Sequence, residues 1–284
     1  NGEMMTRNDL IKSYVTPMSP RPTGLSPAGQ PAGTIECIFF DIYGTLFISK
    51  AGDISMARQR SPQISKLKQL IAKFELSVAP HTLIEKLHHA IEARHHKLRQ
   101  SGSDIPEVEI DIIWQSILAC KDIELARNFA IEYELIANPV YPMPHLAKLL
   151  RACRQQNCDM GLISNAQFFT PLLFEWFLGA EATTLGFSPE LIILSYQIGF
   201  AKPSPVLFET AAAAIEARGI ARSATLVVGN DMLNDIYPAK QTGFQTALFA
   251  GDARSLRLRE DDPRCRKLSA DLVLTDLGQL IAFL

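Results

Sequence analysis

The sequence predicts an α/β fold: a Rossmann-like, doubly wound parallel sheet that carries an inserted all-helical cap. Two observations predict it. The short apolar run from Thr34 to Phe40 has the composition of a strand buried on both faces of a parallel sheet. From residue 140 onward, strand-like and helix-like segments alternate along the chain. Alternation of this kind is typical of a sheet whose ligand site lies beyond the carboxyl ends of its strands.

The α/β core is expected to comprise residues 34–49 and 140–284. Its first strand ends at residue 40, and the other strands and helices follow in alternation after the insertion. The expected later strands are 158–163, 191–195, 225–228, 246–250 and 272–274, and the expected helices are 146–155, 168–177, 205–217 and 235–242.

The segment between the two parts of the core, residues 50–139, has helical periodicity and is expected to form the cap. Trp114 and the segment from Phe129 to Tyr133 are expected to lie in its core. Arg58 and Arg60, near the start of the cap, could contact a substrate carboxylate or phosphate, although a surface position is the more common one for arginine. The expected helices of the cap are 62–74, 81–98, 108–119 and 124–137.

The first 33 residues are expected to form a loosely ordered N-terminal arm. The stretch from Pro17 to Gly33 is rich in proline, glycine and serine. This composition disfavours both a helix and a strand ladder, so neither is expected there.

Composition indicates the class of partner. The chain has 284 residues, 47% of them hydrophobic, and its 28 basic and 30 acidic residues are interspersed, with a formal net charge of −2. No surface for nucleic acid or for an acidic membrane is indicated, so a small anionic molecule is the expected partner. The sequence does not indicate an oligomeric state.

The cysteines and the absence of long apolar runs bear on localisation. No apolar run reaches the roughly 20 residues that a membrane span needs, and the N-terminus lacks the pattern of a signal peptide. The five cysteines form no C-x-x-C pair, which favours free, mostly buried thiols in a reducing compartment and hence a cytoplasmic protein. They are Cys37, Cys120, Cys153, Cys158 and Cys265.

Polar side chains follow several expected strands at the points where those strands end. Asp41 follows the first strand, Ser164 the second and Asp231 a later one, with Lys202 between the last two. The carboxyl ends of parallel strands meet at one edge of a sheet, so these side chains are expected to converge. A carboxylate, a hydroxyl and an ammonium group in one crevice are suited to attack, orient and neutralise an anionic group.

The residues that follow the first strand are Asp41-Ile42-Tyr43-Gly44-Thr45-Leu46. With three later segments, this motif resembles the four motifs of the haloacid dehalogenase-like superfamily, in the same order. The resemblance covers the chain after residue 33 and implies a helical cap between the first two motifs. The later segments are Leu162-Ile163-Ser164-Asn165, Ala201-Lys202-Pro203 and Val228-Gly229-Asn230-Asp231-Met232-Leu233-Asn234-Asp235.

The resemblance implies a role for each matching residue. Asp41 would attack the substrate and form an aspartyl ester, while Gly44 would permit a tight turn that brings backbone N–H groups to the anion. Thr45 and Ser164 would donate hydrogen bonds to substrate oxygens, and Lys202 would neutralise the nucleophile and the developing charge. The implied substrate-binding set is Gly44, Thr45, Ser164, Asn165 and Lys202.

The fourth motif implies a cofactor, Mg²⁺. Asp231 and Asp235 would hold the ion together with one carboxylate oxygen of Asp41 and the backbone carbonyl of Tyr43, all hard oxygen ligands. Asn230 stands where many relatives have their first acid, so Asn230 and Asp231 compete for that place. An ordinary alternative also exists, because two acids at the start of a helix are typical of a cap and a first-turn charge.

Tyr43 departs from the pattern of the superfamily's phosphatases. These enzymes generally have, two residues after the nucleophile, an aspartate that transfers protons, and a phenol with a pKa near 10 replaces it poorly at neutral pH. Tyrosine there resembles the 2-haloacid dehalogenases, which need no metal. Three functions therefore stay open: a Mg²⁺-assisted phosphohydrolase of a small phosphate monoester, a metal-independent 2-haloacid dehalogenase-like hydrolase, and a non-catalytic binding or regulatory protein.

Overall fold

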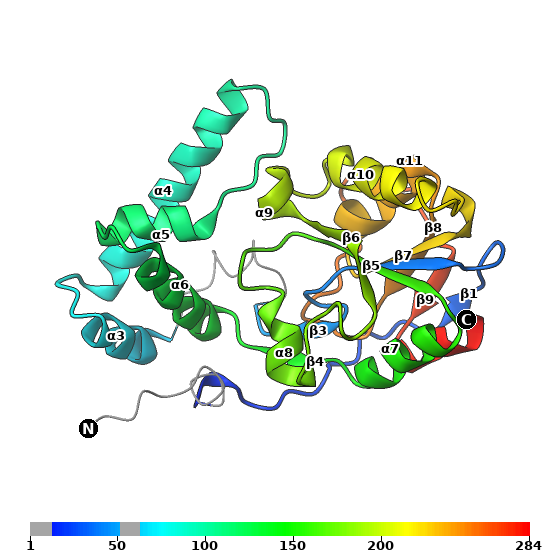
Figure 1. Cartoon of the computed structure of the whole chain (residues 1–284), viewed down its shortest axis with the longest axis horizontal. Helices are drawn as coiled ribbons and strands as arrows, with labels where there is room; N and C mark the ends of the chain where they lie inside the picture. Colours follow the sequence, from blue (N-terminus) through cyan, green and yellow to red (C-terminus); the bar gives the residue numbers. More distant parts are fainter. Residues whose placement is uncertain (1–12, 52–62) are drawn as a thin grey trace.

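The computed structural model describes residues 13–51 and 63–284 (Figure 1). Arg58 and Arg60 lie outside the described residues, as do residues 1–12 of the expected arm. The described chain forms an α/β core and a group of helices to one side of it.

The core is built on a seven-stranded sheet with the order β1-β9-β8-β7-β2-β5-β6. Every neighbouring pair is parallel except β1 and β9. The first strand of the core, β2, lies between β7 and β5, so the connections run outward from it in both directions. The doubly wound parallel sheet is thus confirmed. Its strands are β1 (Ala28–Gly29), β2 (Cys37–Phe40), β5 (Asp159–Ser164), β6 (Phe187–Leu194), β7 (Thr225–Gly229), β8 (Gln245–Phe249) and β9 (Leu272–Leu274).

Helices cover both faces of the sheet (Figure 1). Successive side chains of β2 point to opposite faces: Ile38 and Phe40 pack in one hydrophobic cluster with α7 and η3, while Cys37 and Phe39 pack in another with α10 and α11. Burial on both faces explains why β2 is apolar throughout. The helical elements of the core are α7 (Leu146–Gln155), α8 (Leu172–Leu178), α9 (Ser195–Ile198), α10 (Pro205–Glu216), η1 (Arg222–Ala224), η2 (Met232–Ile236), α11 (Tyr237–Thr242) and η3 (Leu277–Phe283).

The described part of the expected cap segment contains four helices. Its core contains Trp114, whose ring centroid lies 4.8 Å from those of both Phe129 and Tyr133. The predicted burial of this aromatic group is confirmed. The helices are α3 (Ile64–Lys73), α4 (Pro80–Gln100), α5 (Ile110–Leu118) and α6 (Ile123–Ala137).

A small antiparallel sheet joins the helical segment to the core. Strand β3 (Phe47–Ser49) pairs with β4 (Val140–Pro142), so the chain leaves the core and returns to it at adjacent places. The buried Asn138 Oδ1 accepts hydrogen bonds from Ser49 Oγ at 2.8 Å and from the backbone N–H of Ala51 at 3.1 Å. Three-residue strands give too little alternation to be read from the sequence.

The N-terminal arm corrects one expectation. Ala28 and Gly29 form a strand and pair with β9, although no strand ladder was expected between residues 17 and 33. Gly29 makes this pairing possible because it has a φ of +78°, and a Cβ there would lie 2.0 Å from the carbonyl oxygen of Asp271. Thr23 Oγ1 also donates to the carbonyl of Ala250 at 2.9 Å. In the sequence, Gly29 belongs to a stretch whose composition disfavours regular structure. In the structure, the same glycine permits the strand pairing.

The cysteines and the helices of the structure bear on two predictions made from composition. All five cysteines are free and four of them are buried, as expected. Within the described part of the chain, no helix has both the length and the apolar character needed to cross a membrane.

Candidate active site

The candidate site lies at the carboxyl ends of the central strands. A cavity of about 30 Å³ opens there, large enough for a small ion or a water molecule. Six residues of the expected site lie around it, so the sheet brings the separate motifs together: Asp41, Tyr43, Asn165, Lys202, Asp231 and Asp235. The cavity is lined by Asp41, Tyr43, Asn165, Lys202, Asn230, Asp231, Asn234 and Asp235.

Asp41 follows β2, and its backbone N–H donates to the carbonyl of Val228 on the neighbouring strand at 2.9 Å. Its side chain is buried, and its Oδ1 accepts two hydrogen bonds, from Ser164 Oγ at 2.9 Å and from Lys202 Nζ at 2.8 Å. Among the described residues, Asp41 Oδ2 has no donor. One carboxylate oxygen is therefore held in place, and the other has lone pairs available for attack on a substrate.

Lys202 is the cation at the centre of the site. Its buried Nζ donates to Asp41 Oδ1, to Asp235 Oδ1 at 2.5 Å and to the carbonyl of Ile163 at 3.2 Å, which satisfies all three ammonium protons. Burial alone would lower the pKa of Lys202, but the charges of Asp235 and Asp41 outweigh it and raise the pKa. The side chain stays protonated at neutral pH and can offset negative charge at Asp41.

Asp235 and Asn165 hold Lys202 from two directions. Burial raises the pKa of Asp235 to about 7; the charges of Asp41 and Asp231 add to this effect, while Lys202 opposes it. Asn165 Oδ1 accepts the backbone N–H of Lys202 at 2.7 Å. Asn165, expected to bind substrate, thus also positions the loop that carries the lysine.

Tyr43 does not present its hydroxyl to Asp41. The phenol oxygen lies 3.0 Å from Thr170 Oγ1, and the side chain lines a second, largely apolar cavity with Glu134 and Phe169. Burial raises the pKa of Tyr43 above its ordinary value, and the negative charge of Glu134 raises it further. The phenol is therefore a still weaker acid than a free tyrosine at neutral pH.

Gly44 and Thr45 support the site from behind. Thr45 is fully buried and its Oγ1 donates to Asn230 Oδ1 at 3.1 Å, while Asn230 Nδ2 donates to the carbonyl of Ser255 at 2.6 Å. Gly44 has a φ of +83°, and a Cβ there would lie 2.4 Å from the Cβ of Ser255. Gly44, Thr45 and Ser164 are absent from the lining of the 30 Å³ cavity. Both hydroxyls were expected to donate to substrate oxygens. In the structure, the hydroxyl of Thr45 donates to Asn230 and that of Ser164 donates to Asp41.

Arg259 is a member of the site that the sequence did not indicate. Its Nε lies 3.1 and 3.2 Å from the two carboxylate oxygens of Asp231, and its Nη2 lies 2.5 Å from Oδ2. Asp231 also caps η2, since its Oδ1 accepts the N–H groups of Leu233 and Asn234 at 2.9 and 3.2 Å. Asp231 therefore makes the contacts of a helix cap, the ordinary alternative to a metal ligand. Arg259 is 28 residues further along the chain than Asp231. The sequence around it is a run of mixed charges, which is typical of an exposed segment, so it was not expected at the site.

Mg²⁺ was the cofactor expected for the phosphatase interpretation. In residues 13–51 and 63–284, no three His, Cys, Asp or Glu side chains converge so that they could hold a metal ion. Both Asp231 oxygens contact Arg259, and the Asp235 oxygens accept Lys202 Nζ and the backbone N–H of Asp231. As arranged, these side chains do not fit a divalent cation.

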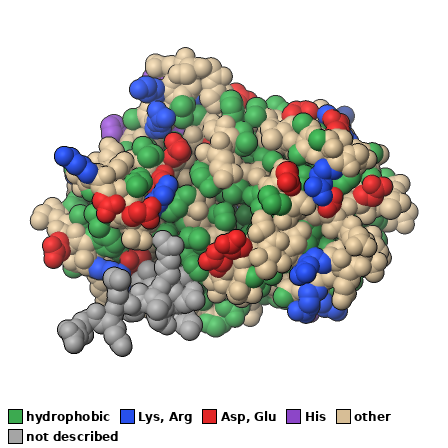
Figure 2. Space-filling view, in the orientation of Figure 1, with side chains coloured by type: hydrophobic (Ala, Val, Ile, Leu, Met, Phe, Trp, Pro, Cys, Tyr) green, Lys and Arg blue, Asp and Glu red, His purple; other side chains and the backbone are tan. Residues whose placement is uncertain are grey.

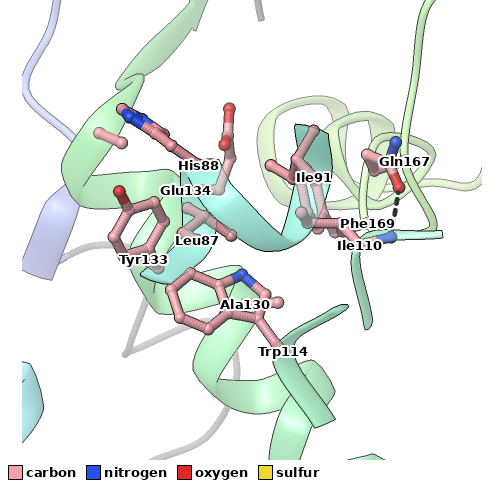
Figure 3. Close-up of a pocket in the computed structure, with 11 residues that line it drawn as sticks. Leu87, His88, Ile91, Ile110, Trp114, Ala130, Tyr133, Glu134, Gln167 and Phe169 are labelled. Carbon is pink, nitrogen blue, oxygen red and sulfur yellow. Dashed lines mark hydrogen bonds between the residues drawn. The ribbon is translucent and has the colours of Figure 1, made fainter. Parts of the chain in front are cut away.

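A larger cavity of about 50 Å³ lies between the cap helices and residues 167–169 of the core (Figure 3). Figure 3 shows the rings of Trp114 and Tyr133 along one part of it. Gln167 closes another side, because its side chain accepts the N–H of Ile110 at 3.0 Å and donates to the carbonyl of Val108 at 2.9 Å. The face shown in Figure 2 is hollowed in its middle, where hydrophobic side chains gather.

Comparisons with known proteins agree with this architecture. A ribulose-1,5-bisphosphate 5-phosphatase from Halopiger xanaduensis is 26% identical over 140 residues, which are 49% of this chain and 54% of that protein. The match thus spans about half of the curated relative. Two solved structures, each 17% identical, share the fold. The structure of a HAD phosphatase from Thermococcus onnurineus has a TM-score of 0.51 over 87% of this chain and 96% of its own. That of a defluorinating L-2-haloacid dehalogenase has a TM-score of 0.54 over 94% and 98%.

A sequence model of a protein family covers most of the chain. The model of the haloacid dehalogenase-like hydrolases matches residues 35–243, which include all four motifs and the helical segment between the first two. This chain belongs to the haloacid dehalogenase-like hydrolase family.

Proposed function

We propose that this hydrolase acts on a small anionic substrate through an ester on Asp41, and that its leaving group departs without a proton. The arrangement of Asp41 supports the proposal above all: Ser164 and Lys202 hold Oδ1, and Oδ2 has no donor among the described residues. A nucleophile held in this way is oriented before the substrate arrives.

The proposed reaction has two steps. Asp41 Oδ2 attacks the carbon or phosphorus atom of the substrate, a bond to the ester oxygen forms, and the leaving group departs with its electron pair. Water then cleaves the ester, releases the hydroxylated product and a proton, and restores the carboxylate. Lys202 stabilises the negative charge throughout, because its ammonium group lies 2.8 Å from Asp41 Oδ1.

The restriction on the leaving group follows from Tyr43. The residue two places after Asp41 would supply a proton in a phosphatase with an acid there, but the hydroxyl of Tyr43 interacts with Thr170. Its raised pKa further weakens it as an acid. A halide or an aryloxide leaves as a stable anion and does not need this proton.

Phosphate monoesters are the first candidate substrate class. The curated relative from Halopiger xanaduensis, by its name, removes a phosphate group from a sugar bisphosphate. Relatedness over half of the chain supports a phosphohydrolase here, with aryl phosphates favoured over alkyl phosphates. A Mg²⁺-assisted form of this reaction would need Asp231 and Asp235 to exchange their present partners.

2-Halo acids are the second candidate class, and the arrangement of charges favours them. Among the described residues, the three carboxylates of Asp41, Asp231 and Asp235 form ion pairs with two cations, Lys202 and Arg259. A monoanionic 2-halo acid is repelled less by this site than a phosphate dianion is. Halide departure also needs neither a metal nor a proton donor.

We also propose that residues 50–139 act as a cap over the core formed by 34–49 and 140–284. The cavity of about 50 Å³ in Figure 3 lies where helices α4, α5 and α6 meet residues 167–169. Its largely apolar lining could accommodate the part of the substrate away from the reacting atom. The cap would thereby contribute to specificity.

A substrate panel tests the proposal. The protein is assayed with an aryl phosphate, an alkyl phosphate and 2-chloropropionate, each with Mg²⁺ and with a chelator, beside Asp41→Asn and the exposed control Asp261→Asn. The proposal predicts turnover of the aryl phosphate or the halo acid, little of the alkyl phosphate, and loss of activity only in Asp41→Asn. Efficient turnover of the alkyl phosphate would refute the restriction on leaving groups. Binding of the anions without any turnover would contradict the proposal and favour the third function, a non-catalytic binding protein.

A further inference from the structure

Asp231 is the acid of the fourth motif that a divalent cation would need, and its oxygens already have five donor contacts. Oδ1 accepts the N–H groups of Leu233 and Asn234 and the Nε of Arg259, while Oδ2 accepts Nε and Nη2 of Arg259. A carboxylate offers about four lone-pair sites. A metal ion could bind Asp231 only after displacing the guanidinium.

Arg259 is held in this position by the backbone on either side of Asp231. The N–H of Met232 donates to the carbonyl of Arg257 at 2.9 Å, and the N–H of Arg257 donates to the carbonyl of Asn230 at 2.9 Å. Arg259 itself has a φ of +54°, in the left-handed region that non-glycine residues seldom occupy. Such a conformation persists where the surroundings impose it, which is common at functional sites.

Asp235 is fixed in a comparable way. Its Oδ1 accepts Lys202 Nζ and its Oδ2 accepts the N–H of Asp231 at 2.9 Å. The side chain also packs on Gly229, where an added Cβ would lie 2.3 Å from the Asp235 carboxyl carbon. Each acid of the fourth motif is therefore neutralised by a cation of the protein itself.

We infer that Arg259 is a permanent counter-cation of this site, and that by occupying Asp231 it keeps divalent cations out. A guanidinium group suits this role because it stays charged at all physiological pH values and matches the two oxygens of a carboxylate. Arg259 acts through Asp231 and is a positioning residue. The inference rests on the proposed function, because it assumes that the Asp41 site is the reacting one, and it deepens that function by making the reaction independent of metal.

Calorimetric titration with Mg²⁺ tests the inference and does not require turnover. The unsubstituted protein is expected to show no saturable binding at millimolar Mg²⁺. Arg259→Gln is expected to gain saturable binding, because Asp231 then carries an uncompensated charge. The double variant Arg259→Gln, Asp231→Asn is expected to lose it again, and Arg259→Lys, which keeps the charge, is expected to bind at least about tenfold more weakly than Arg259→Gln.

Arg257→Gln is the matched control. It removes the same charge from the same segment, but among the described residues Arg257 Nη1 donates only to the carbonyls of Arg254 and Leu256. This control is expected to bind no Mg²⁺. Thermal unfolding of each variant verifies that it is folded, and the titration of the unsubstituted protein is decisive even if Arg259→Gln does not fold.

Saturable Mg²⁺ binding by the unsubstituted protein, removed by Asp231→Asn, would overturn the inference. Failure of a folded Arg259→Gln variant to gain binding would overturn it as well, because Arg259 would then not be what excludes the ion. The proposed function fails by a different observation, namely the absence of an ester on Asp41 with every substrate class. The two failures are therefore distinguishable.

Discussion

The partners of single side chains determine what the candidate site can do. Asp41, Ser164 and Lys202 could be predicted to meet because each follows a strand of a parallel sheet, and the carboxyl ends of such strands converge. The partner of Thr45 could not be predicted, since a hydroxyl group bonds equally well to a substrate oxygen or to Asn230. Arg259 could not be predicted because its contact with Asp231 depends on the path of a loop.

Tyr43→Phe tests the role assigned to the phenol. The substitution removes the hydrogen bond to Thr170, so the free energy of unfolding is expected to fall by about 1 kcal/mol. Turnover is expected to change by less than about tenfold, because the hydroxyl does not act on the substrate. Urea unfolding and steady-state kinetics on one preparation measure both quantities. A large loss of turnover with unchanged stability would show that the phenol is a catalytic acid or base.

At the scale of elements, the long helices could be predicted from hydrophobic periodicity, and the strands buried on both faces from short continuous apolar runs. Helix α7, at Leu146–Gln155, and strand β9, at Leu272–Leu274, have the predicted bounds. The short strands β1, β3 and β4 were not predicted, because two or three residues carry no periodic signal and their pairing depends on distant partners. The predicted helix at 235–242 is divided into η2 and α11.

Asp271, which precedes β9, links β8 to α11 and gives a pH-dependent prediction. Its Oδ2 accepts the N–H and Oγ1 of Thr246, each at 2.8 Å, and its Oδ1 accepts Lys240 Nζ at 2.7 Å. Burial would raise the pKa of Asp271, but these hydrogen bonds outweigh it and lower the pKa. A lowered pKa stabilises the fold above the unfolded-state value of about 3.9, and this stabilisation is lost as the pH falls through the folded-state pKa.

Asp271→Asn is therefore expected to lower the free energy of unfolding by about 1 to 3 kcal/mol at neutral pH. The difference from the unsubstituted protein is expected to shrink as the pH falls below about 4. Urea unfolding over this pH range measures it, with the exposed Asp261→Asn as control. An equal loss of stability at neutral and acidic pH would show that the charge of Asp271 is not the source.

At the scale of the whole molecule, the division into a core and a helical segment could be predicted from the pattern of apolar residues. This pattern becomes helical at about residue 50 and changes to an alternation of strands and helices at about residue 140. The position of the cavities between the core and the helical segment could not be predicted, since it depends on how segments 104–110 and 165–169 pack. Gln167, for example, holds Ile110 and Val108 against the core. Around this frame, the site has the aspartate and the lysine that the family resemblance implies, and its other two acids, Asp231 and Asp235, form ion pairs with Arg259 and Lys202.

The central claim is that the Asp41 carboxylate forms a covalent ester during hydrolysis. Rapidly quenched reactions, digested and analysed by mass spectrometry, test it most directly with each substrate that the protein turns over. The account predicts that the peptide containing Asp41 gains the mass of the transferred group during turnover, and that Asp41→Asn neither gains this mass nor releases product. Product release without any change in the mass of this peptide, or sustained turnover by Asp41→Asn, would contradict the account.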